Sequence, residues 1–418
     1  MQNLRKAIAD FDFSALYKNV TEARERYLSA LDEYENTFGV SDDAMILSVP
    51  GRSELLGNHT DHNGGKVLAG AIDRDVIAIV SKTDDGIITV KSEGYPTESI
   101  AVRDVSSKEN FKSFTSSALI AGVADGILKR GGNIGGYKAY ITSDVPRGSG
   151  ISSSAAYEVM IGNILNHLYN GGEIANTEIA KISQYAENVY FGKPSGLMDQ
   201  MACAVGGFVY IDFADKNAPV IKPIEFSLGK AGYELCIVNT GGNHADLNDD
   251  YASVPREMRA VASTLGREIL SGVDECEIIA NAGEIRKACG DRALLRSLHF
   301  VRENERVESG AKALNSENID AFFREVIASG RSSFEYLQNV YTNKNVTEQG
   351  LSLALALTEG MSESVGAFRV HGGGFAGTIQ AYVKCADVDK YVELMDGVFG
   401  EESVMCLTVR PVGAIRVI

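Results

Sequence analysis

A short glycine- and serine-rich segment offers the clearest chemistry in this sequence. Residues 145–156 read VPRGSGISSSAA, with two glycines and four serines between positions 148 and 154. Glycine lets a backbone approach an anion closely, and serines at a helix start add hydroxyls where the helix dipole favours negative charge. A serine that only caps the helix is the simpler alternative, but so many small polar residues favour a cradle for phosphate. The pattern G-x-x-x-x-G-K-[ST] is absent, which excludes the common P-loop.

A second segment is dense in hydrogen-bonding side chains. Residues 50–65 read PGRSELLGNHTDHNGG, and we interpret them as a loop that binds a polyhydroxylated ligand. His59, Asp61 and His62 are alternative metal ligands, although their spacing matches no established metal motif. A solvated polar loop is the third interpretation, and the apolar pair Leu55 and Leu56 in the middle of the segment argues against it.

Two carboxylates and a late glycine cluster complete the candidate set. Asp199 lies in GKPSGLMDQM (192–201), twelve residues after Glu187. A carboxylate in such apolar, glycine-rich surroundings is a candidate base or Mg²⁺ ligand, with a helix cap as the structural alternative. Residues 372–377 (GGGFAG) match G-x-G-x-x-G, which would suggest a dinucleotide-binding dehydrogenase. A predicted strand follows them and no βαβ unit surrounds them, which argues against that class.

The elements that must position these residues alternate without a steady βαβ rhythm. Residues 1–38 have helical spacing and stop at Gly39, and we predict a surface helical cap there. The predicted strands are 75–83, 86–92, 137–145, 208–213, 233–240, 378–383 and a final one near 403–410. The predicted helices are 153–169, 175–191, several within 253–361, and one from Asp387. This pattern predicts an α+β protein of two domains.

Composition narrows the function classes further. A chain of 418 residues is long enough for two domains with ample core. The net charge of −16 argues against a nucleic-acid or anionic-membrane surface. Six cysteines without CxxC pairing indicate reduced thiols, and no stretch approaches the length of a membrane span. We therefore expect a cytoplasmic protein, monomeric, that binds small molecules and neither nucleic acid nor membrane.

Together and in this order, the four segments resemble the GHMP family of small-molecule kinases, and within it the galactokinases. Residues 51–65 are similar to the signature GRxNLIGEHTDYNGG, and residues 145–156 to the phosphate loop PxGxGLSSSA. GKPSGLMDQM resembles G-x-x-x-G-x-M-D-Q, and HGGGFAG (371–377) resembles GGGFGG. The resemblance spans roughly residues 38–410. It implies a helical cap (1–40), an N-terminal kinase domain (41–215) and a C-terminal kinase domain (216–418), with the active site in the cleft between the domains.

The resemblance also implies an activity: ATP- and Mg²⁺-dependent phosphorylation of galactose at its anomeric C1 hydroxyl, giving galactose 1-phosphate. Asp199 matches the catalytic base, and Arg52 matches the arginine that would keep this base ionised and stabilise charge during transfer. The other matching positions are expected ligand contacts. These are Asn58, His59, Asp61, Gly196 and Tyr251 for the sugar; Gly148, Ser149, Gly150, Ser152, Ser153 and Ser154 for the ATP phosphates; and Ser154 and Glu187 for Mg²⁺, with the choice among the last three serines left open.

The sequence departs from the family pattern at several positions. Glu54, Asn58, His62 and Ala376 stand where the family has Asn, Glu, Tyr and Gly, and the chain has no tryptophan to place against adenine. Loss of the negative charge at position 58 leaves open a galacturonokinase, or a related sugar-1-kinase with altered C6 specificity. A non-catalytic sugar-sensing regulator is the remaining alternative. Such relatives lose part of the serine loop, which is complete here.

Overall fold

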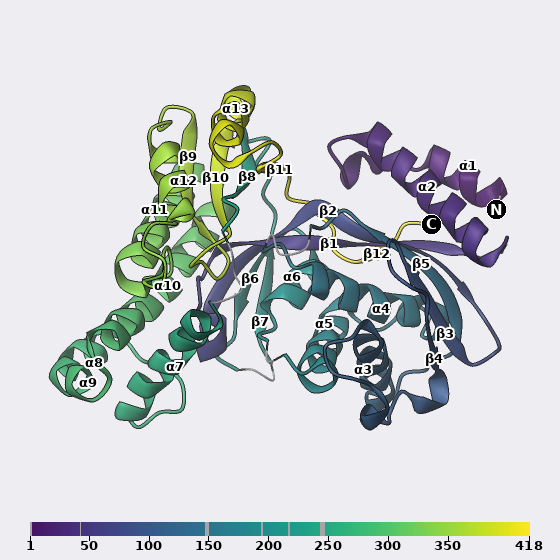
Figure 1. Cartoon of the computed structure of the whole chain (residues 1–418), viewed down its shortest axis with the longest axis horizontal. Coiled ribbons are helices and arrows are strands. Elements are labelled where there is room, and N and C mark those ends of the chain that lie inside the picture. Colours follow the sequence, from purple (N-terminus) through teal and green to yellow (C-terminus); the bar gives the residue numbers. More distant parts are fainter. Residues whose placement is uncertain (1, 42, 147–149, 194, 216–217, 243–246) are drawn as a thin grey trace.

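An eight-stranded sheet forms the framework of the larger lobe (Figure 1). The computed structural model describes residues 2–418 except 42, 147–149, 194, 216–217 and 243–246. The strands run in the order β12-β1-β2-β5-β3-β4, with β6 paired to β2 and β7 paired to β6. Only the pairing of β3 with β5 is parallel. The strands are β1 (Met45–Leu56), β2 (Lys66–Lys82), β3 (Ile87–Ser92), β4 (Glu98–Ala101), β5 (Tyr137–Ser143), β6 (Phe208–Asp212), β7 (Val220–Ile224) and β12 (Ile415–Arg416).

Helices cover both faces of this sheet, so its central strand is apolar on both sides. On β2, Ile77 and Ile79 face a cluster with the N-terminal helices, whereas Val76, Ala78 and Val80 face the main core. Side chains of a strand alternate between faces, so burial of both faces requires a continuous apolar run. The covering helices are α1 (Gln2–Asp10) and α2 (Val20–Phe38) on one face, and α3 (Ser116–Lys129), α4 (Ser153–Tyr169), α5 (Asn176–Tyr185) and α6 (Met198–Val205) on the other (Figure 1).

The smaller lobe contains an antiparallel four-stranded sheet in the order β11-β8-β10-β9. Its strands are β8 (Tyr233–Asn239), β9 (Val365–His371), β10 (Thr378–Lys384) and β11 (Val404–Leu407). Its helices are α7 (Asn248–Thr264), α8 (Glu275–Ala280), α9 (Ala282–Cys289), α10 (Asp291–Asn315), α11 (Ile319–Ser332), α12 (Gly350–Glu359) and α13 (Val388–Phe399). The long helix α10 packs beside α11 and also reaches β1 and β2 of the larger lobe. A side chain at Gly310 would collide with Leu56, which explains the glycine at this crossing.

Short helical turns of other types extend or join these elements. Two π-helical segments, η5 (Ala186–Phe191) and η6 (Ser333–Leu337), continue α5 and α11. The 3-10 turns are η1 (Phe13–Ala15), η2 (Asp61–Asn63), η3 (Val102–Asp104), η4 (Lys108–Asn110) and η7 (Cys385–Asp387).

Most elements predicted from the sequence are confirmed. Helix α4 begins and ends at the predicted residues, and the helix predicted over 175–191 is α5 with its π-helical extension η5. The interpretation of residues 50–65 as a loop is wrong for its first half, because β1 runs to Leu56. The elements that were not predicted are the helices α3 and α6 and the strands β1, β4, β7, β9 and β12.

The two lobes follow the expected domain division only in part. Strands β7 and β12 come after residue 215 but pair with the first sheet. We therefore keep the division at residues 215 and 216 as a proposal, with β7 and the C-terminal strand returning to the larger lobe.

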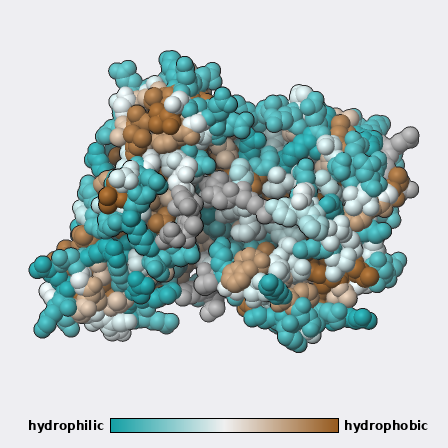
Figure 2. Space-filling view, viewed as in Figure 1, coloured by the Kyte–Doolittle hydropathy of each residue, from teal (hydrophilic) through white to brown (hydrophobic). Residues whose placement is uncertain are grey.

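The surface and the thiols agree with the composition. Figure 2 shows a largely hydrophilic face with separate apolar patches. Among the described residues, no helix combines the length and apolar character needed to cross a membrane. All six cysteines are free thiols, and the Sγ atoms of Cys236 and Cys406 lie 3.8 Å apart on paired strands.

Candidate active site

Asp199 joins three of the segments singled out in the sequence. It lies in the first turn of α6, where Oδ1 accepts hydrogen bonds from Arg52 Nε (2.9 Å) and Nη2 (2.6 Å). Its Oδ2 accepts a hydrogen bond from Ser152 Oγ (2.6 Å) at the start of α4. Burial by itself would raise the pKa of Asp199, but the charge of Arg52 and the bonds from Ser152 and Arg52 hold it below its usual value. The carboxylate is therefore ionised at neutral pH.

Arg52 is held in place by the serine-rich loop that follows β5. Its Nη1 donates to the carbonyl of Gly150, and its backbone N–H donates to the carbonyl of Ile151 (3.1 Å). A β-bulge in β1 between Pro50 and Arg52 turns this part of the strand toward the loop. A side chain at Gly51 would lie 2.7 Å from the carbonyl of Ile151, so only glycine allows the approach.

Asp61 supplies a second carboxyl group close to the first. It belongs to the short turn η2 after β1, and a Cβ at Gly196 would lie 2.0 Å from Asp61 Oδ2. The Asp61 carboxylate therefore packs against the backbone of Gly196, and any larger residue at position 196 would collide with it. Burial, together with the negative charges of Asp199 and Glu54, raises the pKa of Asp61 to about 6. The two neighbouring carboxyl groups therefore differ in their readiness to ionise.

His59 and Tyr251 both contact the glycine turn of residues 372–374. His59 has a left-handed backbone (φ 59), and its Nε2 donates to the carbonyl of Gly373 (2.9 Å). Burial lowers the pKa of His59, so the ring is neutral and its Nδ1 is an acceptor. Tyr251, on α7, donates its hydroxyl to the carbonyl of Gly374 (2.8 Å), and a side chain at Gly373 would collide with its ring.

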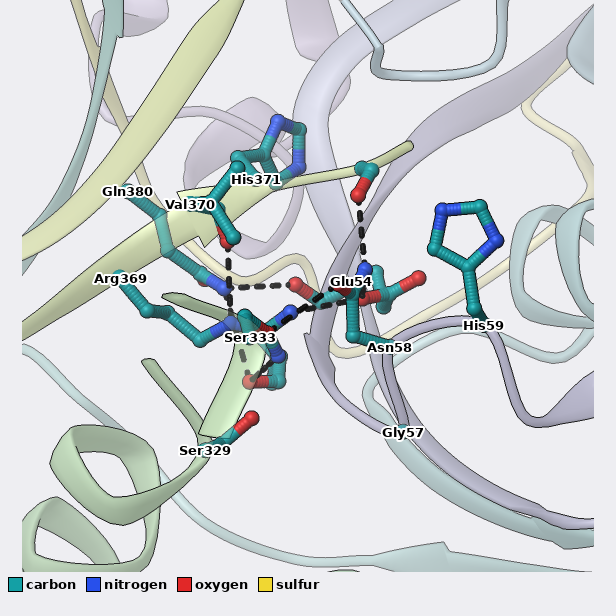
Figure 3. A network of polar contacts seen from close by, with 12 residues as sticks. Glu54, Gly57, Asn58, His59, Ser329, Ser333, Arg369, Val370, His371 and Gln380 are labelled. Carbon is teal, nitrogen blue, oxygen red and sulfur yellow. Dashed lines mark hydrogen bonds and ion pairs between the residues drawn. The ribbon is translucent and has the colours of Figure 1, made fainter. Parts of the chain in front are cut away.

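Asn58 differs from its expected role as a sugar contact. The residue is fully buried, and its Nδ2 donates to Glu54 Oε1 (3.0 Å) and to the carbonyl of Gly372 (2.7 Å). Its Oδ1 accepts from Ser333 Oγ (3.2 Å) and Asn339 Nδ2 (2.8 Å). An amide has two donor hydrogens and two acceptor lone pairs, so the protein itself satisfies every hydrogen-bonding group of this side chain. Figure 3 shows Asn58 inside this network, with His59 directed away from it.

The phosphate-loop candidates fall into two groups. Gly148 and Ser149 lie outside the described residues, whereas Gly150 (φ 75) lies against the ring of His371. Ser152 adopts a left-handed conformation (φ 62) at the start of α4, and its hydroxyl binds Asp199 instead of capping the helix. This geometry excludes the simple helix-cap interpretation for Ser152. Ser153 and Ser154 form the first turn of α4.

Ser153 and Ser154 line a cavity of about 940 Å³ beside β3 and β5. Aromatic side chains also line this cavity, and the rings of Phe114 and Phe191 meet edge to face at 5.3 Å. Phe114 has a left-handed backbone (φ 63) and is 69% exposed, which is unusual for phenylalanine. Sequence reasoning missed this cavity, because its aromatic residues come from separate parts of the chain, two from loops and two from helical segments. These residues are Tyr95, Phe114, Tyr157 and Phe191.

A buried pair of glutamates lies behind the start of α4. Glu187, in η5, accepts hydrogen bonds from Lys193 Nζ (2.8 Å), Ser195 Oγ (2.5 Å) and Gln200 Nε2 (2.8 Å). Gln200 also donates to Oε2 of Glu158 (3.1 Å), whereas Glu158 Oε1 is buried without a hydrogen-bond partner among the described residues. Burial and the neighbouring Glu187 raise the pKa of Glu158 well above its usual value. Sequence reasoning missed Glu158, although it lies one helical turn after Ser154.

The alternative metal site at His59, Asp61 and His62 finds no support. In the part of the chain that the structure describes, no group of three or more His, Cys, Asp or Glu side chains is arranged to hold a metal ion. The rings of His59 and His62 lie side by side with centroids 5.7 Å apart. Burial lowers the pKa of His62 well below its usual value, so this ring is neutral as well.

Comparison with known proteins identifies the family. Residues 32–82 match the model of the galactokinase galactose-binding signature, and residues 118–207 match the N-terminal domain of the GHMP kinases. The chain is 31% identical over 88% of its length to a galactokinase of Streptomyces coelicolor (92% of that protein). It is 30% identical over 82% of its length to one of Clostridium tetani (84% of that protein).

Solved structures share the fold. The crystal structure of Lactococcus lactis galactokinase with galactose superposes with a TM-score of 0.79 at 24% identity, covering 93% of this chain and all of that one. The mevalonate kinase of Methanococcus jannaschii superposes with a TM-score of 0.61 at 16% identity, covering 88% of this chain and 99% of that one. With its two lobes, its four motif segments and these matches, this chain belongs to the galactokinases of the GHMP kinase family.

Proposed function

We propose that this protein transfers the γ-phosphoryl group of ATP to the anomeric C1 hydroxyl of galactose, giving galactose 1-phosphate and ADP. The observation that carries the proposal is the meeting of Asp199, Arg52 and Ser152, which joins the sugar segment to the phosphate loop at one ionised carboxylate. The relatives named above are galactokinases, and the Lactococcus lactis enzyme was solved with galactose. These names support galactose as the sugar.

Asp199 is the proposed general base. An ionised carboxylate that already accepts hydrogen bonds can take the proton of the attacking hydroxyl. Besides this proton acceptor, phosphoryl transfer requires mainly alignment of the reactants and neutralisation of the phosphate charge. Arg52 keeps the base charged and places a positive group where negative charge builds up. His59, Asp61, Gly196 and Tyr251 are the proposed sugar contacts, and Asn58 supports them from behind.

The nucleotide would lie along the start of α4. Backbone and hydroxyl groups of residues 148–154 are the proposed phosphate contacts, and the cavity with Tyr95 and Phe114 would take the adenine, since both rings offer faces for stacking. Because no tryptophan is present, these rings are the candidates for that role.

The residues near α4 also fit a magnesium ion. Glu158 Oε1, which has no hydrogen-bond partner among the residues described, is a hard oxygen ligand whose burial is costly without a cation. Ser154 lies one turn before it on the same helix. Ser154 and Glu187, with Glu158 added, would hold Mg²⁺ together with phosphate oxygens. The ion would neutralise phosphate charge when bound. Lys193 forms an ion pair with Glu187, so the lysine and the metal ion would share that carboxylate.

Oligomeric state and location complete the proposal. We propose a monomer in the cytoplasm, where six free thiols would stay reduced. A galacturonokinase and a sugar-sensing regulator, the two alternatives left open by the sequence, find no support in the comparisons.

A coupled assay of ADP release tests the proposed reaction. The panel is galactose, galacturonate, arabinose, glucose and N-acetylgalactosamine, with phosphorus NMR to locate the phosphate on the product. We expect the highest kcat/KM for galactose and a phosphate on C1. Turnover of galacturonate above that of galactose, or sugar binding without any ADP release, would refute the proposal.

A further inference from the structure

A second site rich in arginine lies on the smaller lobe. Helices α10 and α11, with η6, line an open cavity of about 550 Å³. Arg302 and Arg306 are one turn apart on α10, and Arg324 and Arg331 are two turns apart on α11. Four arginines thus line one pocket of a chain whose net charge is −16, with Glu335 as the only carboxylate among its lining residues.

These arginines are incompletely neutralised. Arg302 pairs with Glu275 (2.5 Å), and Arg306 pairs through Nε with Glu303 (2.7 Å). Arg306 Nη2 is buried and has no hydrogen-bond partner among the described residues. Arg324 and Arg331, both exposed, form no ion pair with any carboxylate in the described part of the chain. A buried donor without an acceptor is costly, so an anionic oxygen that reached Arg306 Nη2 would relieve a cost that the protein carries alone.

The inner wall of this pocket is bonded to the segment that precedes His59. Glu303, which holds Arg306, accepts the backbone N–H groups of Gly57 (3.0 Å) and Asn58 (3.4 Å) and the hydroxyl of Ser329 (2.6 Å). Burial by itself would raise the pKa of Glu303, but Arg306 and other nearby positive groups lower it to about 2, so it stays ionised.

A second chain of bonds runs parallel to the first. Ser332, on the pocket wall, bonds to Nδ1 of His299 (2.9 Å), and Nε2 of His299 donates to the carbonyl of Asn58 (2.9 Å). Backbone groups of this turn are therefore bonded to Glu303 and His299, each of which contacts a residue that lines the arginine pocket. Figure 3 shows the turn at the point where Asn58 meets Ser333, together with Ser329, which belongs to α11.

We propose that this arginine pocket binds the phosphate group of a small phosphorylated metabolite and that this binding strengthens sugar binding at the turn of residues 57–59. Guanidinium groups match phosphate oxygens in geometry and charge, and a cavity of this size is large enough for a small ester. The anion would pair with the exposed Arg324 and Arg331 and, after a shift of the Arg306 side chain, with its buried Nη2, while the bond from Arg306 Nε to Glu303 stays intact. It would thereby fix Glu303 and pre-organise the turn before sugar arrives. The second part of the proposal rests on the proposed sugar site.

Calorimetry tests the pocket itself. Inorganic phosphate and, separately, glycerol 3-phosphate are titrated into the full chain saturated with a non-hydrolysable ATP analogue, which fills the phosphate loop. We expect one site in the wild type and at least about tenfold weaker binding in Arg324→Gln/Arg331→Gln, which removes two charge-assisted contacts. The control Arg103→Gln/Arg256→Gln removes the same charge from exposed positions away from the pocket and should bind like the wild type.

Two outcomes overturn the pocket. The first is that the wild type binds neither inorganic phosphate nor glycerol 3-phosphate. The second is that the wild type, the pocket variant and the control variant bind these probes with equal affinity. Tighter binding of glycerol 3-phosphate than of inorganic phosphate supports a metabolite ester as the ligand. Equal or weaker binding of the ester overturns that identification.

The link to the sugar site has its own readout. We expect the galactose Kd of the wild type to fall by about fivefold or more at saturating phosphate ester, as typical coupling energies give, and to stay constant in Arg324→Gln/Arg331→Gln. An unchanged Kd in the wild type overturns the link. Loss of galactose binding under all conditions would instead contradict the proposed function, while the phosphate titration still decides whether the pocket binds.

Discussion

Asp199 shows how a buried carboxylate can be kept ready to accept a proton. Its two oxygens are divided between a guanidinium group and a hydroxyl, and the guanidinium of Arg52 is itself anchored to the carbonyl of Gly150. Burial by itself would lower the pKa of Arg52, but the negative charge of Asp199 raises it above its usual value. Each partner therefore keeps the other charged.

The first prediction concerns Asp199→Asn. We expect kcat to fall by roughly 10²–10⁴-fold, because a positioned general base is lost, while the galactose Kd changes little. ADP release and calorimetry measure the two quantities. Thermal unfolding is the control, since the substitution leaves Arg52 without its counter-charge. Near-normal turnover in a folded variant would show that Asp199 is structural.

Asp61 has the opposite electrostatic character, and this gives a prediction with a defined pH dependence. Its folded pKa of about 6 is above the usual value of 3.8, so the fold loses stability as the pH rises through this window. Asp61→Asn removes that loss. We expect the variant to be more stable than the wild type above pH 6, by at most about 3 kcal/mol at about 1.4 kcal/mol per pKa unit, and equally stable below about pH 4.

Urea unfolding at several pH values checks the Asp61 prediction. We expect the same variant to bind galactose more weakly at pH 7, since a proposed acceptor is lost. A variant that is less stable than the wild type at pH 7 would mean that this carboxylate contributes favourable contacts that outweigh its burial.

At the scale of elements, the start of α4 supplies several of the groups that the proposed reaction needs. Ser152 turns its hydroxyl to Asp199, and Ser153 and Ser154 face the cavity. Glu158 lies one turn later, and its Oε1 has no hydrogen-bond partner in the part of the chain that the structure describes. One helix end thus brings together the proposed phosphate contacts, metal ligands and a bond to the base.

The metal prediction follows from this helix end. Replacing Ser154, Glu158 or Glu187 with Ala should raise the Mg²⁺ concentration needed for half-maximal activity, because each change removes one oxygen from the proposed ion. Titration of Mg²⁺ at saturating ATP and galactose measures the effect, and Ser195→Ala, which removes a bond to Glu187 without removing a proposed ligand, is the comparison. Unchanged Mg²⁺ curves in all three variants would refute the assignment.

The sequence predicted many of the elements with regular periodicity, although it missed the regular helix α3, and it also missed strand β1, whose backbone is irregular. Helix α4 was predicted to the residue because its apolar positions repeat at spacings of three and four. Strand β1 was missed because Pro50 and Gly51 usually break strands, whereas here they form a β-bulge that aims Arg52 at the phosphate loop.

The site was predictable where a motif carried the chemistry and not where packing decided it. Arg52 and Asp199, expected to lie together, do so. Asn58 was expected to face the sugar, but its partners come from distant segments around residues 333, 339 and 372 that no local pattern reveals. The sequence around Glu158 is that of an ordinary helix, and only the fold shows that this side chain lies close to Glu187.

At the scale of the whole molecule, a buried polar network ties the two lobes together (Figure 3). Glu54, on β1 of the larger lobe, pairs with Arg369 on β9 of the smaller lobe (3.1 Å) and accepts from Asn58. Both members of the Glu54 and Arg369 pair are buried. Removal of one partner from such a pair is much more costly than removal of both.

This network gives the last prediction. Asn58→Glu places a second carboxylate beside Glu54 and removes two donated bonds, so we expect it to lower the free energy of unfolding by about 3 kcal/mol or more. Glu54→Gln leaves Arg369 without its counter-charge and should also destabilise. The double variant Glu54→Gln/Asn58→Glu keeps one carboxylate in the network and should recover much of the loss. Urea unfolding of all four proteins gives the coupling energy, and purely additive effects would contradict the prediction.

Strand β12 has a consequence for the order in which the protein is made. Its residues pair with Leu47 and Ser48 at one edge of β1, and the two residues that follow it, Val417 and Ile418, exchange hydrogen bonds with Ile46 (2.8 Å and 3.0 Å). At roughly 5–20 residues per second, a ribosome releases β1 on the order of tens of seconds before β12. During that interval the nascent chain presents an unpaired strand edge, which can pair with other chains. We therefore expect this edge of the larger lobe to remain available for such pairing until β12 has been synthesised.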